Sequence, residues 1–129
     1  MTRTTMAWLL LSLMTSPVLA QQPDVAPILW RALTDMPGKE VLMRTVEYPP
    51  GGSDPVHRHD AHGCISVLAG SVVMQVQGGT EVTLTPGQRF YEGPNDVHVV
   101  GRNASTTRPA KFLVLLVKDQ GAPTLVPVR

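Results

Sequence analysis

The sequence has a single cysteine and almost no excess of charge of either sign. Cys64 is the only cysteine among 129 residues, so no disulfide can form within the chain. A folded domain must therefore rely on core packing, helped by a metal ion or a partner subunit. Eleven basic residues nearly cancel ten acidic ones, which argues against nucleic acid and anionic membranes as partners. Cys64 lies in an apolar stretch and is expected to be buried rather than reactive.

Residues 1–20 have the layout of a secretory signal peptide. Arg3 precedes an apolar run at residues 6–14, and small residues lead up to Ala20, after which cleavage is expected. The alternative is an uncleaved membrane anchor, but the apolar run is shorter than the ~20 residues that span a bilayer. We therefore expect an exported protein, periplasmic or secreted, that has no membrane contact after signal cleavage and folds as one domain.

The sequence predicts an all-β domain over residues 41–129, after a lead segment at residues 21–40 that includes a possible short helix at residues 29–33. The expected strands are residues 41–48, 65–68, 71–77, 81–85, 89–92, 97–100, 112–117 and 124–128. Gly78-Gly79 predicts a tight hairpin between two of them. This density of short strands indicates an antiparallel sandwich or a closed barrel.

The histidines fall in two places and predict a metal site. His57, His59 and His62 lie close together, and His98 lies in a later strand-like segment. In an extended chain, residues two apart project to the same side, so His57 and His59 can present both imidazoles to one point. Imidazole is a ligand for zinc, copper, iron and nickel, and a further donor must come from another strand. His98 is the one remaining histidine that can supply it.

At these residues the sequence resembles the cupin superfamily. The first cupin motif spaces a glycine, a His-x-His pair, a glutamate and a closing glycine, and Gly51, His57, His59 and Gly70 keep that spacing. The later His98 keeps the spacing of the second motif. The resemblance implies a small single-domain cupin, an all-β double-stranded β-helix or jelly-roll barrel. It also implies one divalent transition-metal ion per chain (iron, manganese, copper, nickel or zinc) inside the barrel.

The sequence departs from the motif at its glutamate, where it has Gly63. His62 is the nearest candidate donor and is predicted as the fourth metal ligand, because some cupins use histidine here. Strict alternation would point His62 away from the site, unless a bulge turns it inward. A site of imidazoles alone would attract anionic or easily ionised ligands. Arg89 and Tyr91 are candidates for the pocket wall, with the surface and the core, respectively, as the alternatives.

The resemblance implies a dioxygenase-like, metal-dependent oxidoreductase that acts on a small organic molecule, with its catalytic residues unidentified. The alternative is a non-catalytic module that binds a metal or a small molecule, which the lack of an evident general acid or base permits. The retained histidines disfavour a cupin that has lost its metal. Strands near Val41 and Thr124 would be exposed edges, and pairing them in a homodimer is one way to cover them.

Overall fold

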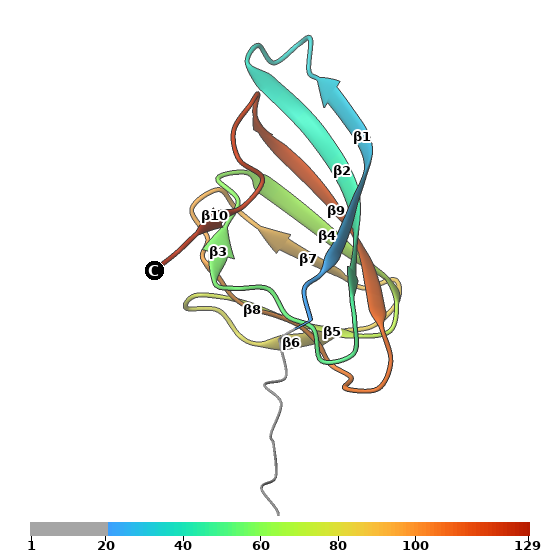
Figure 1. The fold of residues 1–129 in the computed structure, drawn as a ribbon. Coiled ribbons are helices and arrows are strands. Elements are labelled where there is room, and N and C mark those ends of the chain that lie inside the picture. The colour runs from blue at the N-terminus through green and yellow to red at the C-terminus, as the bar shows by residue number, and fades with distance from the viewer. Residues whose placement is uncertain (1–20) are drawn as a thin grey trace, which may run out of the picture.

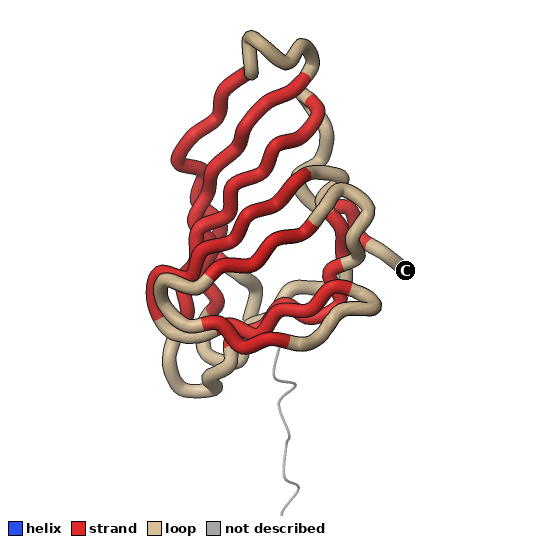
Figure 2. Tube along the Cα trace, turned by 180° about the vertical axis from the view of Figure 1, so that it is seen from behind, coloured by secondary structure: helices blue, strands red, loops and turns tan. Residues whose placement is uncertain are grey.

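The computed structural model describes residues 21–129, which form two five-stranded antiparallel sheets (Figures 1 and 2). One sheet has the order β1-β2-β9-β4-β7 and the other β10-β3-β8-β5-β6. The strands are β1 (Asp24–Ala32), β2 (Lys39–Tyr48), β3 (His57–Arg58), β4 (His62–Ala69), β5 (Val72–Val76), β6 (Val82–Leu84), β7 (Arg89–Glu92), β8 (His98–Asn103), β9 (Ala110–Asp119) and β10 (Val126–Pro127). The predicted all-β jelly roll is confirmed, and the predicted signal peptide lies outside the described residues.

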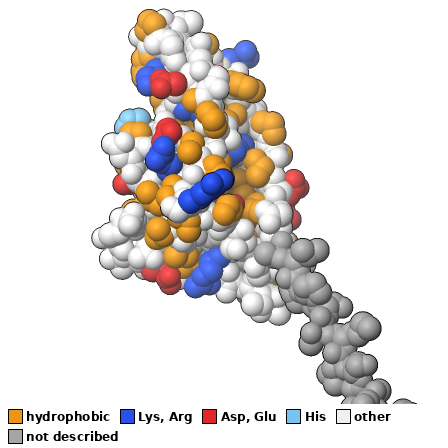
Figure 3. All heavy atoms as spheres, turned by 60° about the vertical axis from the view of Figure 1, so that its left-hand side comes forward, with side chains coloured by type: hydrophobic (Ala, Val, Ile, Leu, Met, Phe, Trp, Pro, Cys, Tyr) orange, Lys and Arg blue, Asp and Glu red, His pale blue; other side chains and the backbone are white. Residues whose placement is uncertain are grey.

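The described residues contain no helix, and so no helical segment suited to spanning a bilayer. On the face of the molecule shown in Figure 3, acidic and basic side chains are interspersed with apolar ones. This mixture agrees with the near balance of charge in the sequence.

The core lies between the two sheets, where the strands alternate between inward and outward side chains. In β2, Leu42, Val46 and Tyr48 are buried on one face, and Phe112 and Leu116 of the neighbouring strand β9 lie beside them on the same face. The rings of Tyr48 and Phe112 meet edge to face, with centroids 4.9 Å apart. This apolar packing holds the strands that carry the site residues described below.

The lead segment forms a strand, and the predicted helix at residues 29–33 is wrong. β1 pairs antiparallel along β2, and all nine of its residues are exposed, Ile28 at 55% and Trp30 at 65%. A short apolar run does not distinguish a helix from a strand by its periodicity, and the neighbouring β2 supplies the pairing that decides it. β1 rather than the strand near Val41 is therefore an edge of this sheet, and β10 is an edge of the other.

The outer face of the first sheet carries Cys64, Tyr91 and Arg89, and the surface was the alternative position for Arg89. Cys64 is exposed, so its predicted burial is wrong. In β4 the buried positions are Gly63, Ile65 and Val67, and alternation places Cys64 outside. Tyr91, 57% exposed, and Arg89 lie on the same outer face of the neighbouring strand β7, so neither lines the interior.

Gly70, the closing glycine of the first motif, lies where two backbone segments meet. Its φ is 68°, and an added Cβ would lie 2.5 Å from the carbonyl oxygen of Pro109. Gly78 has a similar φ of 81° but open space around it. We expect Gly70→Ala to lower the free energy of unfolding by about 3 kcal/mol or more, and Gly78→Ala by about 1–2 kcal/mol. Urea denaturation measures both, and equal losses would show that the close approach at Gly70 is unimportant.

Candidate metal centre

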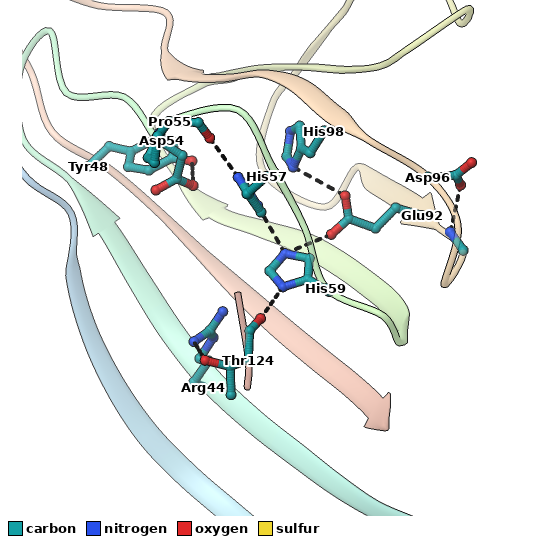
Figure 4. A network of polar contacts seen from close by, with 11 residues as sticks. Arg44, Tyr48, Asp54, Pro55, His57, His59, Glu92, Asp96, His98 and Thr124 are labelled. Carbon is teal, nitrogen blue, oxygen red and sulfur yellow. Dashed lines mark hydrogen bonds and ion pairs between the residues drawn. The ribbon is translucent and has the colours of Figure 1, made fainter. Parts of the chain in front are cut away.

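Three of the four predicted histidines meet inside the barrel (Figure 4). His57 lies in β3, His59 follows that strand, and His98 begins β8 directly opposite His57 in the ladder. All three are buried, and one ring nitrogen from each lies within 4.8 Å of the others. Alternation along the extended segment turns His57 and His59 to the same side, as the sequence predicts.

Main-chain carbonyl groups set the tautomers of His57 and His59. Nδ1 of His57 donates to the Pro55 carbonyl oxygen at 2.7 Å, and Nδ1 of His59 donates to that of Thr124. A carbonyl oxygen only accepts, so each Nδ1 carries a proton, and a neutral ring then presents a lone pair at Nε2. Burial, joined by the neighbouring imidazoles, lowers the pKa of His57 and favours this neutral form.

The two Nε2 atoms face each other at 3.1 Å. Two bare lone pairs at that distance repel unless a proton or a cation lies between them. Nitrogen ligands about 2.0–2.1 Å from one ion, at close to a right angle, lie about 3 Å from each other. The pair formed by His57 and His59 therefore fits two adjacent positions on a metal ion.

His98 brings a third imidazole whose polar atoms are unsatisfied. Nε2 is buried without a hydrogen-bond partner among residues 21–129. Nδ1 lies 3.1 Å from Oε2 of Glu92, close enough for an ion pair but not aligned as a hydrogen bond. A buried polar atom without a partner costs about 1–3 kcal/mol, and an ion bound among the three rings would remove part of that cost.

Glu92 contacts two of the three histidines, and sequence reasoning missed it. The side chain is 3% exposed, and Oε1 lies 3.0 Å from Nε2 of His59. Burial raises the pKa of Glu92, but the contacts with His59 and His98 outweigh burial and lower it to about 2. The carboxylate is therefore ionised, so the structure brings a buried negative charge beside the imidazoles that the sequence predicts as the only ligands.

The position of Glu92 explains why Gly63 stands where the first cupin motif has its glutamate. Glu92 lies directly across the ladder from Gly63, where the cupin motif has its glutamate. A Cβ built on Gly63 would lie 2.9 Å from Cγ of Glu92. The Glu92 side chain thus fills the space beside Gly63. The signal that could have revealed it is the pairing of β4 with β7, together with an acidic residue at an inward position of β7.

The structure leaves His62 outside the cluster. His62 is exposed, and its Nδ1 lies 2.7 Å from the hydroxyl of Tyr91 on the outer face. The bulge that would have turned it inward is absent from this end of β4, because the register with β9 shifts only between Val67 and Ala69. Strict alternation therefore holds, and His62 points away from the other three histidines.

A cavity of about 80 Å³ lies beside the histidines and Glu92. Tyr48 also lines it, and its hydroxyl donates to Oδ2 of Asp54 at 2.5 Å. Burial, the Asp54 carboxylate and that hydrogen bond raise the pKa of Tyr48, so the phenol stays protonated. The arrangement combines three buried imidazoles, one carboxylate and a small cavity, a donor set suited to a divalent transition metal.

The family model described as "Cupin domain" matches residues 44–116. No sequence among the curated proteins matches the chain. Among solved structures, the chain is similar to the DMSP lyase DddQ from Ruegeria pomeroyi, at 26% identity and a TM-score of 0.61, over 68% of this chain and 43% of that one. It is similar to an oxalate oxidase at 25% identity and a TM-score of 0.59, over 68% of this chain and 46% of that one.

A protein from Klebsiella pneumoniae with a double-stranded β-helix domain is similar over a larger share of both chains. It has 17% identity and a TM-score of 0.65, over 83% of this chain and 86% of that one. At this identity the likeness shows the fold alone. The chain spans less than half the length of the DMSP lyase and of the oxalate oxidase.

Proposed function

Since this chain belongs to the cupin family, we propose that it is a metal-dependent oxidoreductase that acts on a small organic molecule. His57, His59, His98 and Glu92 would hold one divalent transition-metal ion per chain. The observation that carries this proposal is the pair of Nε2 lone pairs 3.1 Å apart, fixed by main-chain carbonyls and backed by a buried carboxylate. Imidazole and carboxylate ligands together suit iron and manganese as well as zinc.

Residues around this centre would have two roles, to orient the imidazole ligands and to supply negative charge. Pro55 and Thr124 orient the two imidazoles of the His-x-His pair through their carbonyl oxygens, as partners behind the ligands do in many metal sites. Glu92 supplies one negative charge, which would offset part of the charge of the ion. When bound, the ion would supply Lewis-acid and redox chemistry.

Two of the similar structures support a catalytic role for this centre. One is an oxalate oxidase and the other a DMSP lyase, both named for reactions of small organic molecules. This chain covers less than half of each, so their activities are a guide to the reaction class and not to the substrate. The second candidate function is a binding module without turnover, favoured by the small cavity of about 80 Å³ at the histidines.

Turnover separates the two candidates. In an oxygen electrode, the metal-loaded protein should consume oxygen with a member of a panel of catechols, flavonols, diketones and small carboxylates. His98→Ala should reduce that rate about 100-fold, because it removes an imidazole of the centre. His62→Ala, which changes an exposed histidine, is the matched control and should leave the rate unchanged. No turnover with any metal or substrate would favour the binding module, and substrate loss without oxygen uptake would indicate a lyase.

The proposal extends to export and to self-association. The signal-peptide layout of residues 1–20 supports export with cleavage after Ala20. The exposed apolar side chains of the edge strand β1, such as Ile28 and Leu29, support a homodimer that covers them. Neither nucleic acid nor a membrane is proposed as a partner, in line with the near balance of charge.

A further inference from the structure

The arginine Arg44 lies on the inner face of the barrel, beside the candidate metal centre. Arg44 occupies an inward position of β2, between the buried side chains of Leu42 and Val46. Its neighbours across the two ladders are Pro27 and Val114, which are both apolar. Arg44 is half-buried, and partial burial of a guanidinium among apolar residues is costly unless its charge and its donors are matched.

The guanidinium of Arg44 is poorly matched within the described residues. Nη1 donates to Oγ1 of Thr124 over a long 3.3 Å, and Nε is buried without a partner among residues 21–129. None of the ion pairs found in this part of the chain includes Arg44. Burial lowers the pKa of Arg44, and the charges of Asp54 and Glu92 partly offset this effect. Both carboxylates have other partners, because Asp54 accepts a hydrogen bond from Tyr48 and Glu92 contacts the histidines.

Arg44 borders two cavities. One is the cavity of about 80 Å³ beside the histidines, and the other, of about 280 Å³, lies between β1, β2 and the C-terminal segment. Thr124 connects Arg44 to the candidate metal centre (Figure 4). Its carbonyl oxygen accepts a hydrogen bond from His59, and its hydroxyl accepts one from Arg44. A group bound by Arg44 would therefore sit next to the candidate metal centre.

The larger cavity favours an anion with an apolar body. Its lining includes the apolar side chains of Val25, Pro27, Trp30 and Leu42, and it contains no acidic residue. The other charged residue in the lining, Lys118, already forms an ion pair with Glu40 at 2.5 Å. Arg44 is thus the cation of this lining that forms no ion pair among residues 21–129.

We propose that Arg44 binds the carboxylate of the substrate, a small organic acid whose apolar body occupies the cavity of about 280 Å³. A planar guanidinium and a carboxylate match through paired, charge-assisted hydrogen bonds. The inference rests on the proposed function, because it places the substrate beside the metal centre. It makes Arg44 a specificity-determining residue and names the substrate class that the proposed function leaves open.

The test measures carboxylate preference without the metal. Isothermal titration of protein stripped of metal by a chelator compares benzoate with benzamide, which has nearly the same shape but no charge. The wild-type protein should bind benzoate at least about tenfold more tightly than benzamide, as expected for charge-assisted hydrogen bonds. Arg44→Met should remove this preference, and Arg44→Lys should retain part of it, because lysine keeps the charge without the planar fork.

Arg102→Met is the matched control, since Arg102 is a half-exposed arginine on β8 that lies 3.8 Å from Glu81. It should leave the preference for benzoate intact, and thermal unfolding of each variant shows that it is folded. Equal affinity of the wild-type protein for benzoate and benzamide, or a preference that survives in Arg44→Met, overturns the proposal. Because metal is absent from this measurement, its outcome is independent of whether the histidines bind a metal ion.

Discussion

The double variant His57→Ala and His59→Ala is expected to lose its metal, from about one transition-metal ion per chain to less than about 0.1. Both Nε2 lone pairs that converge at 3.1 Å disappear, and His98 and Glu92 alone offer too few donors. The measurement is elemental analysis of protein expressed with its full chain and purified without chelator. Elemental analysis identifies the ion as well as its amount, and the identity of the ion limits the reactions that the centre could catalyse.

Two comparisons make this result specific. His62→Ala should retain the full metal content, because the side chain is exposed and bonded to Tyr91 on the outer face. The double variant should remain folded, since the buried apolar residues of the core lie elsewhere between the sheets. Equal metal content in the wild-type protein and the double variant would show that the histidine cluster is not a metal site.

The residues that sequence reasoning placed well are those governed by local alternation. His57 and His59 are two apart in an extended segment, so their shared direction follows from backbone geometry alone. His98 was predicted by elimination and by the cupin spacing, and it lies opposite His57 in the ladder. The strand at residues 89–92 matches β7 residue for residue, because turn-forming residues bound it on both sides.

The residues that it placed badly depend on which strand lies beside which. His62 was chosen as a donor because it is near Gly63 in the chain, whereas Glu92 is near Gly63 across the ladder. Nothing in the sequence states that β4 pairs with β7. In the same way, residues 29–33 form a strand and not the predicted helix because β2 lies beside them. The sequence did not predict that Arg44 points inward, because this direction depends on the register of β2.

Removing the Glu92 side chain is expected to weaken metal binding strongly. Glu92→Ala should lower the affinity for the ion about 10–100-fold, because the variant loses the one carboxylate in contact with His59 and His98. Glu92→Gln, which keeps the shape and removes the charge, should show a similar loss. Competition with a chromophoric chelator measures the affinity. Glu81→Gln, at an exposed carboxylate, should bind the ion like the wild-type protein.

Returning the carboxylate to the position of the cupin motif is the stronger test of Glu92. Gly63→Glu alone should destabilise the protein, because its Cβ would lie 2.9 Å from Cγ of Glu92. With Glu92→Gly in the same chain that space is free, and the double variant should recover metal affinity to within about tenfold of wild type. Recovery would show that the two facing positions of β4 and β7 can each supply the same ligand. Wild-type affinity in Glu92→Gln, or no recovery in a folded double variant, would limit Glu92 to a structural role.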